Sequence, residues 1–235
     1  MATRISRSNV SNMFDSIAPT YDLMNHLLSF GVDRGWRRKT VKLIGQGRHQ
    51  TIADFATGTG DLAIALAKKL SPKQIYGLDF SAEMLKIAKS KCEKEGVGQR
   101  VELREENCEH TTLADGEAEA VTCAFGIRNF NDAEQGLREM HRVLTRGGQV
   151  AILEFSTPRK GIVGALVRWY YMHVMPSAGK LIAGNKGAYT YLPKTILEFP
   201  DGERFCEMMR QAGFVEVGFR SLTFNMVNLY FGKKA

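Results

Sequence analysis

The chain has 235 residues, of which 44% are apolar and 24% charged, a composition typical of a globular protein long enough to bury a sizeable core in one domain. The amino-terminal residues lack the apolar run of a signal peptide, and no apolar stretch approaches the roughly eighteen residues of a membrane span. These features predict a soluble cytoplasmic protein. The four cysteines lack the paired spacing of metal ligands, so we expect structural free thiols and no metal: Cys92, Cys108, Cys123 and Cys206.

The net charge of +7 is concentrated in two segments. Residues 1–50 carry eight Lys or Arg against three Asp, a net +5, and residues 156–195 carry six Lys or Arg and no acid, a net +6. The other 145 residues therefore sum to −4. This distribution predicts a face that attracts an anionic partner, either membrane head groups or nucleic acid. An ordinary solvated surface is the alternative.

Apolar residues near helical spacing predict two short helices within residues 9–30, separated at Pro19. A third helix, basic and amphipathic, is expected at 36–44 and ends near Gly45. After it, strands and helices alternate with short links. The predicted strands are 51–56, 74–78, 100–104, 118–125 and 149–155, and the predicted helices between them are 62–70, 82–95 and 133–144.

This alternation implies right-handed crossovers and an α/β fold with a doubly wound, mostly parallel sheet. Residues 158–183 interrupt it with a segment that is apolar, aromatic and basic together, which we interpret as a helical insertion. A helix at 201–212 and closing strands at 214–219 and 223–231 bring the sheet to seven strands. The predicted single domain, 1–235, comprises an amino-terminal helical cap (1–48), a cofactor-binding core (49–156), the insertion (157–200) and a closing helix with strands (201–235).

A glycine turn, DFATGTGD at residues 54–61, joins the first predicted strand to the first helix of the core. Gly58 and Gly60 can adopt backbone angles closed to other residues, and they lack the Cβ atoms that would keep a nucleoside away. The run from Gly58 to Ala63 satisfies the dinucleotide pattern G-x-G-x-x-A, and Asp79 follows at the end of the second strand, where an acid meets ribose hydroxyls.

Asp61 decides which nucleoside fits this turn. A dinucleotide places its pyrophosphate at the helix N-terminus, where a fixed carboxylate would repel it. S-adenosylmethionine has an ammonium, a sulfonium and no phosphate, so Asp61 and Asp54 suit its methionine end while Asp79 accepts the ribose hydroxyls. A helix cap is the alternative role for Asp61. Asn107 and Cys108 follow the third strand, where the adenine edge would lie.

Five segments together carry a resemblance: DFATGTGD, LDFSAEML, FGIRNF, LTRGGQVAILEFS and, before the core, YDLMNHLLSFGVDRGW. They resemble the class I, Rossmann-like S-adenosylmethionine-dependent methyltransferases, and the last resembles the signature of their UbiE subgroup, the quinone C-methyltransferases. The match runs from about Phe14 to the carboxyl terminus. The resemblance implies methylation of demethylmenaquinol in menaquinone biosynthesis. The alternative substrate is a 2-polyprenyl-6-methoxy-1,4-benzoquinol of ubiquinone biosynthesis.

The resemblance also implies cofactor contacts at Thr59, Asp79, Asn107 and Cys108. The full set of expected cofactor-binding residues is Asp54, Thr57, Gly58, Thr59, Gly60, Asp61, Asp79, Phe80, Met84, Asn107, Cys108 and Ala124. Departures occur where many members have Gly at Thr57, Ser at Ala124, His at Asp33 and Lys-Pro at Thr145-Arg146. Ala124 removes a hydroxyl contact to the cofactor, and Asp33 indicates a different substrate contact.

Methylation of a ring carbon requires alignment with the sulfonium and a deprotonated neighbouring hydroxyl, because a phenol has a pKa near 10. Arg128 would stabilise the resulting oxyanion, and Asn129 would orient a water or the substrate oxygen. Pairing of Arg128 with Glu154 in a purely structural role is the alternative. The proton-acceptor candidates are Tyr21, Asp22 and His26 of the amino-terminal signature and Glu154 at the end of the fifth strand.

Three other functions stay open: a nicotinamide-dependent oxidoreductase, an RNA-modifying methyltransferase and a binding protein without catalysis. Asp61 disfavours the first, and the lack of a recognised RNA-binding module disfavours the second, so we expect no nucleic-acid partner. For a prenylated quinol, the insertion would form the wall of a tail-binding channel or rest on anionic lipid at the inner face of the membrane. An ordinary core helix is the alternative, and a homodimer is a further hypothesis.

Overall fold

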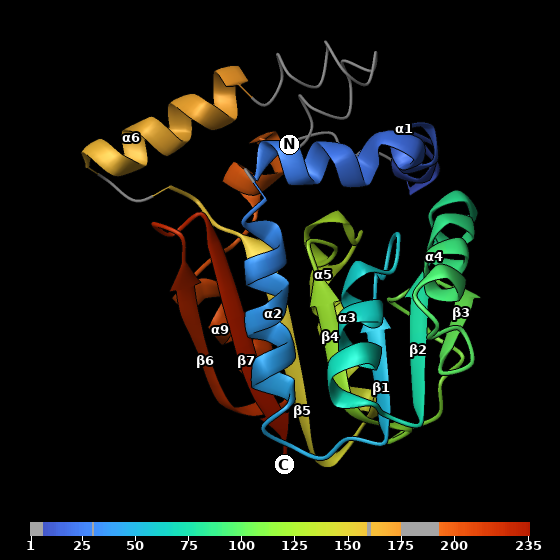
Figure 1. Ribbon diagram of the computed structural model, residues 1–235. Helices are drawn as coiled ribbons and strands as arrows, with labels where there is room; N and C mark the ends of the chain where they lie inside the picture. The colour runs from blue at the N-terminus through green and yellow to red at the C-terminus, as the bar shows by residue number, and fades with distance from the viewer. Residues whose placement is uncertain (1–6, 30, 159–160, 175–192) are drawn as a thin grey trace.

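Seven strands form one central sheet in the computed structural model, which describes residues 7–29, 31–158, 161–174 and 193–235 (Figure 1). The strands are β1 (Thr51–Phe55), β2 (Gln74–Asp79), β3 (Val101–Glu105), β4 (Ala118–Ala124), β5 (Leu144–Phe155), β6 (Phe214–Leu222) and β7 (Val227–Lys234). Their order is β3-β2-β1-β4-β5-β7-β6, and only β7 runs antiparallel to its neighbours. The predicted α/β fold with a doubly wound, mostly parallel seven-stranded sheet is confirmed.

Helices cover both faces of this sheet. The helices packed on the faces are α2 (Asp33–Ile44), α3 (Asp61–Leu70), α4 (Ala82–Lys94), α5 (Ala133–Val143) and α9 (Glu203–Gln211). Two more, α1 (Arg7–Leu28) and α6 (Ile162–Trp169), lie beyond the carboxyl ends of the parallel strands (Figure 1). One apolar core joins α2, α3 and the sheet, and a second joins α5, α9 and the opposite face. Side-chain caps begin two of the helices: Ser81 accepts a hydrogen bond from the Met84 N–H, and Asp132 accepts one from Gln135.

The amino-terminal helix corrects the prediction of two short helices. Residues 7–28 form one helix with Pro19 inside it, and Figure 1 shows α1 bending along its length. Proline lacks the N–H that would bond to the carbonyl of Asp15, so the hydrogen-bond ladder is interrupted and the helix bends. Burial of Ile17 and Ala18 directly before the proline favours the helical conformation there despite this loss.

Strands β5 and β7 differ from the predicted bounds. β5 begins at Leu144 rather than Gln149, because Leu144 pairs with Ala118 ahead of a register shift. β7 covers Val227–Lys234 instead of 223–231, because the preceding residues form a tight turn. Thr223, Phe224 and Asn225 have positive φ values of 44°, 53° and 64°, which are incompatible with a strand.

The predicted insertion contains α6, a π-helical turn at Tyr170–Val174 and a helical turn at 193–198. Residues 159–160 and 175–192 of that insertion lie outside the described residues. In the part of the chain that is described, no helix is both long and apolar enough to cross a membrane. All four cysteines are buried free thiols, as expected.

Candidate active site

A small cavity lies at the carboxyl ends of β1, β2 and β4. The strand order reverses direction between β1 and β4, and in doubly wound sheets this switch point is where ligands bind. The cavity has a volume of about 40 Å³. Its lining residues are Tyr21, Ala56, Gly58, Asp79, Phe80, Met84, Ala124, Phe125, Gly126 and Asn129.

The backbone approaches this cavity closely because two strand ends turn sharply. Ala56 after β1 and Phe125 after β4 have positive φ values of 52° and 60°, and Gly58 has 54°. A Cβ on Gly126 would lie 2.3 Å from the Ala56 Cβ, so only glycine fits at that position. The two strand ends therefore present backbone rather than side chains to a ligand.

Asp79 fixes the glycine turn against the end of β2. Its carboxylate accepts hydrogen bonds from the Gly58 N–H at 2.8 Å and the Ser81 N–H at 3.0 Å. Burial raises the pKa of Asp79 to about 6, and the backbone hydrogen bonds oppose that rise. A carboxylate offers about four acceptor positions, so Asp79 retains capacity for ribose hydroxyls.

Asp54 lies below the cavity, inside the sheet. Its two oxygens accept hydrogen bonds from the hydroxyls of Thr57 at 2.7 Å and Thr122 at 2.6 Å. Burial raises the pKa of Asp54 to about 6. This network holds the glycine turn to β4, so the geometry gives Asp54 and Thr57 a supporting position rather than a place in the cavity wall.

Asp61 is held by two cations. Its carboxylate lies 2.5 Å from the Lys91 ammonium and 3.5 Å from an Arg37 guanidinium nitrogen. Gly60, in the left-handed conformation, occupies the N-cap of α3, and no side chain caps that helix. The alternative role of Asp61 as a helix cap is therefore wrong, and its carboxylate pairs with two cations of the protein.

The helix α1 closes over this turn. Asp22 accepts hydrogen bonds from the Thr59 hydroxyl at 2.6 Å and from Lys91 at 2.7 Å. Asp15 accepts one from the Ser81 hydroxyl at 2.5 Å, and Tyr21 lines the cavity. Cofactor pockets usually enclose about 300–1,000 Å³, and this cavity is smaller than that with α1 in its present position. We therefore expect α1 to move when a nucleoside cofactor enters.

Asn107 and Cys108 lie beside the turn but not in the cavity wall. The Cys108 thiol is buried, accepts from the Ala56 N–H at 3.2 Å and donates to the Leu78 carbonyl at 3.6 Å. Burial raises the pKa of this thiol well above its ordinary value, so Cys108 is a structural thiol rather than a nucleophile. The Asn107 side chain accepts from the Glu109 N–H at 3.1 Å.

Arg128 and Glu154 form a buried ion pair at the end of β4 and β5. Arg128 Nη1 lies 2.7 Å from Glu154 Oε1, with side-chain exposures of 5% and 1%. Arg128 Nη1 also donates to the Phe125 carbonyl, whereas its buried Nε has no hydrogen-bond partner among the described residues. Burial raises the pKa of Glu154, and Arg128 opposes that rise. The predicted alternative, an Arg128–Glu154 pair, is thus present.

Tyr21 and Asn129 are the two candidate catalytic residues in the cavity wall. Burial raises the pKa of Tyr21 above its ordinary value, and Arg128 and a hydrogen bond with Asn25 only partly offset this. The phenol therefore stays protonated at neutral pH and can donate a hydrogen bond, but it is a poor proton acceptor. The Asn129 amide lies 3.5 Å from the Phe125 carbonyl.

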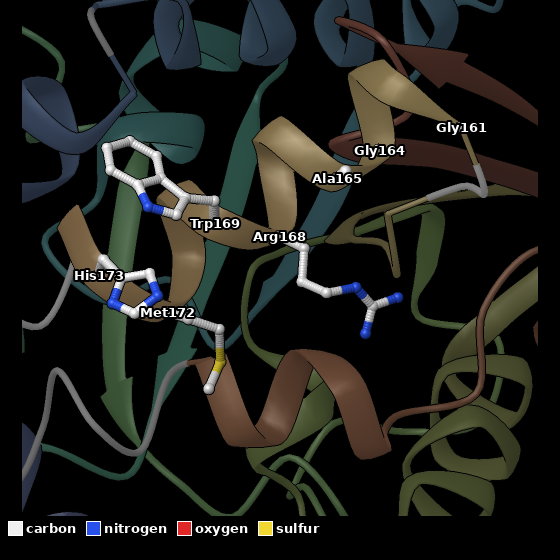
Figure 2. Close-up of a pocket in the computed structure, with 7 residues that line it drawn as sticks. All are labelled: Gly161, Gly164, Ala165, Arg168, Trp169, Met172 and His173. Carbon is white, nitrogen blue, oxygen red and sulfur yellow. The ribbon is translucent and has the colours of Figure 1, made fainter.

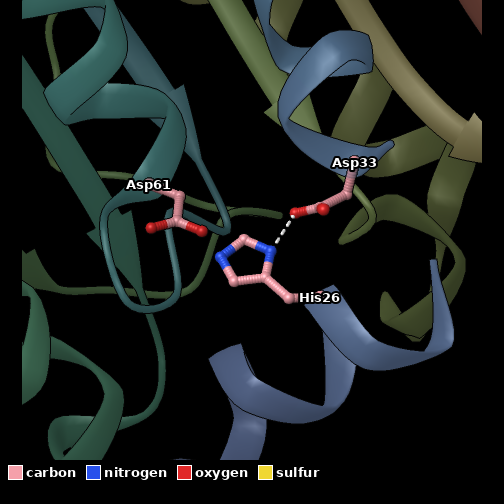
Figure 3. Close-up of side chains that lie close together, drawn as sticks. All are labelled: His26, Asp33 and Asp61. Carbon is pink, nitrogen blue, oxygen red and sulfur yellow. Dashed lines mark ion pairs between the residues drawn. The ribbon is translucent and has the colours of Figure 1, made fainter. Parts of the chain in front are cut away.

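His26, Asp33 and Asp61 lie close together next to the glycine turn (Figure 3). His26 Nδ1 is 2.8 Å from Asp33, and Arg37 donates to the same Asp33 oxygen at 2.6 Å. Burial would raise the pKa of Asp33, but hydrogen bonds from His26 and Ser29 and the charge of Arg37 hold it below its ordinary value. Arg37 and Lys91 already form ion pairs with these carboxylates, so their positive charges would repel a metal ion at this place.

The cavity thus gathers seven of the predicted site residues, and the rest surround it. In the cavity wall are Tyr21, Gly58, Asp79, Phe80, Met84, Ala124 and Asn129. Below or beside it are Asp54, Thr57, Thr59, Gly60, Asp61, Asn107, Cys108, Arg128 and Glu154. Three lining residues, Ala56, Phe125 and Gly126, were not predicted, although their positions directly after β1 and β4 were an available signal.

Comparison with known proteins identifies relatives over nearly the whole chain. The model of the ubiE/COQ5 methyltransferase family matches residues 2–234. The demethylmenaquinone methyltransferase of Bacteroides fragilis is 44% identical over 96% of this chain and 92% of its own length. The ubiquinone/menaquinone biosynthesis C-methyltransferase UbiE of Geotalea uraniireducens is 43% identical over 96% of both chains.

Among solved structures, the [4+2]-cyclase SpnF has a similar fold. It superposes with a TM-score of 0.72 at 14% identity, covering 96% of this chain and 95% of its own. At that identity the likeness extends to the fold alone.

Proposed function

Because the chain belongs to the ubiE/COQ5 methyltransferase family, we propose that it methylates a ring carbon of demethylmenaquinol with S-adenosylmethionine as the methyl donor. The observation that carries this proposal is the 44% identity to a demethylmenaquinone methyltransferase over 96% of the chain. The 43% identity to a protein named for both ubiquinone and menaquinone biosynthesis keeps the polyprenyl methoxy-benzoquinol as the second candidate substrate.

The cavity residues fit the chemistry of this donor, whose sulfonium supplies the methyl group. Asp79 is suited to accept the ribose hydroxyls, and Phe80 after β2 and Met84 in the first turn of α4 supply apolar contact. Asp61 attracts cations and would repel a phosphate at the N-terminus of α3. These features support a phosphate-free, cationic nucleoside over a nicotinamide dinucleotide.

Arg128 is suited to stabilise the phenolate oxygen that activates the ring carbon. Its buried Nε without a partner is a donor held in a low-dielectric environment, where a hydrogen bond to an oxyanion is strongest. Glu154 orients the guanidinium through its ion pair, and is therefore a positioning residue rather than the base. Tyr21 and Asn129 would donate hydrogen bonds to the substrate oxygen from the cavity wall.

The reaction is tested by incubating the purified protein with S-adenosylmethionine and each reduced quinone separately, followed by mass spectrometry of the extracted quinones. We expect a gain of one methyl group on demethylmenaquinol. Methylation of the benzoquinol alone would establish the second candidate substrate. Calorimetry should show binding of S-adenosylmethionine and none of NADH; the reverse result would support an oxidoreductase.

The insertion supports a second proposal, contact with anionic membrane lipid from the cytoplasmic side. Apolar side chains spaced along one stretch of α6 and the following turn are exposed, namely Ile162, Leu166, Trp169 and Met172 at 83%, 62%, 57% and 51%. Figure 2 shows Trp169 and His173 on one side of the helix and Arg168 extending to the other. An open groove of about 450 Å³ lies on this segment, and Arg168, Trp169, Met172 and His173 are among its lining residues. Exposed apolar side chains beside basic ones favour the interface of an anionic bilayer.

A vesicle-binding assay tests this contact. The protein should bind vesicles with anionic lipid more tightly than neutral vesicles, and added salt should weaken binding because it screens the charges. Replacement of Trp169 and Leu166 by Ser should reduce binding, whereas replacement of the exposed Val215 on β6 should not. Equal binding to both kinds of vesicle would refute the proposal. The homodimer remains a prediction, to be checked by light scattering.

A further inference from the structure

Arg37, on the second turn of α2, lies next to the cofactor cavity. Its side chain is 11% exposed, and its guanidinium carbon is 5.7 Å from the centre of the Phe125 ring, which lines the cavity. It lies 3.5 Å from Asp61 at the start of α3. Removing a charge from water is costly, so a nearly buried cation at this place needs acidic or hydrogen-bonding partners that compensate for the lost hydration.

The hydrogen bonds of the two cations at Asp61 distinguish them. Lys91 has three N–H donors and contacts three acceptors, in Asp22, Asp61 and Thr59, at 2.7, 2.5 and 3.2 Å. Arg37 has five N–H donors, and within the described part of the chain it donates one hydrogen bond, to Asp33 at 2.6 Å. Lys91 is therefore saturated, whereas the guanidinium of Arg37 retains donors for a further acceptor.

We infer that Arg37 binds the α-carboxylate of the methyl donor. The methionine end of S-adenosylmethionine carries one ammonium and one carboxylate, and a site for it needs one acid and one base. Asp61 supplies the acid, and Arg37, 3.5 Å from Asp61, supplies the base. A guanidinium presents a planar pair of N–H groups that matches a carboxylate, which a lysine ammonium does not.

Asp33 orients this guanidinium. Asp33 is buried and accepts hydrogen bonds from Ser29 at 2.8 Å and from Arg37, so the base of α2 holds the Arg37 side chain in one position. The arrangement links α2 to the amino-acid end of the donor, whereas Asp79 is suited to the ribose end. The inference rests on the proposed function only through the identity of the methyl donor.

The test compares two ligands by calorimetry: S-adenosylmethionine and its decarboxylated form, which lacks only the carboxylate. The wild-type protein should prefer the former. Arg37→Met should weaken binding of S-adenosylmethionine about 10- to 100-fold, the range expected for a charged hydrogen-bonded pair, and change binding of the decarboxylated form less than about twofold. Arg37→Lys keeps the positive charge but lacks the planar pair of N–H groups, so its affinity for S-adenosylmethionine should lie between those of the wild type and Arg37→Met.

Lys91→Met is the matched control, since Lys91 also contacts Asp61; it should preserve the preference for the carboxylated ligand. Equal weakening of both ligands by Arg37→Met, or loss of the preference in Lys91→Met alone, would overturn the inference. If thermal melting shows that Arg37→Met is not folded, Arg37→Lys is used for the same comparison. A loss of affinity for S-adenosylmethionine alone supports the inference, and an equal loss for both ligands overturns it. Because no quinol is present, failure of the quinol assay leaves this result intact.

Discussion

Asp79 combines two roles in one side chain, holding the Gly58 and Ser81 backbone and presenting a carboxylate to the cavity. Asp79→Ala should therefore weaken S-adenosylmethionine binding by about 10- to 100-fold, measured by calorimetry. Because burial raises the pKa of Asp79 to about 6, wild-type affinity should fall as the pH drops below that value and the acceptor becomes protonated. Asp115→Ala, at an exposed carboxylate before β4, is the matched control and should bind normally.

Arg128 is expected to act on the reaction and not on donor binding. Arg128→Ala should lower kcat by about 10- to 1,000-fold while leaving the affinity for S-adenosylmethionine nearly unchanged, because the guanidinium is placed for the substrate oxyanion. Steady-state kinetics with demethylmenaquinol, together with calorimetry, separate the two quantities.

Glu154→Gln serves as the companion variant of Arg128→Ala, since it loosens the guanidinium without removing it and should lower kcat less. Thermal melting of both variants identifies any effect that comes from the lost buried pair. Wild-type kcat in Arg128→Ala would show that the proposed mechanism is wrong.

At the scale of elements, hydrogen bonds hold α1 against the glycine turn, and we call these contacts the latch. Asp22 connects them through Thr59 and Lys91. Asp22→Ala should speed both entry and release of S-adenosylmethionine by about 5- to 30-fold, because about 1–2 kcal/mol of hydrogen bonding is lost from the closed state. Stopped-flow fluorescence measures both rates. Glu83→Ala, which breaks an exposed ion pair with Lys86 elsewhere on α4, should leave them unchanged; unchanged rates in Asp22→Ala would contradict a latch.

Local patterns predicted most elements, and the exceptions depend on contacts between distant segments. The glycine turn and Asp79 were predictable because a strand, a turn and a helix start within a few residues of sequence. The positions of Ala56 and Gly126 directly after β1 and β4 could have marked them, but their close approach could not be predicted, because it arises only when β1 pairs with β4. Likewise, the sequence gives no sign that Asp22 would meet Thr59 or that Pro19 would bend one helix instead of separating two.

For the whole molecule, the buried Asp54 makes stability depend on pH. Burial raises its pKa to about 6 in the folded protein, against 3.8 for the unperturbed group. Between these values the folded protein binds more protons than the unfolded chain, so the free energy of unfolding falls as the pH rises. The contribution is fully present below about pH 4 and is lost above about pH 6; its size is up to about 3 kcal/mol.

Asp54→Asn removes this titration. As the pH rises from about 4 to 7, the free energy of unfolding of the wild type should therefore fall relative to that of Asp54→Asn. Urea denaturation of both proteins across that range measures it, and all other titrating groups are common to the pair. A constant difference would show that Asp54 titrates outside this range.

The closed position of α1 also has a consequence for the time course of the reaction. The spent donor has nearly the size of the fresh one, so a movement of α1 that admits the one is needed again to release the other. If that movement is slower than methyl transfer, the first turnover should appear as a rapid burst of methylated quinol, equal in amount to the enzyme, followed by a slower steady rate. Loosening the latch would then raise the steady rate while leaving the burst amplitude the same.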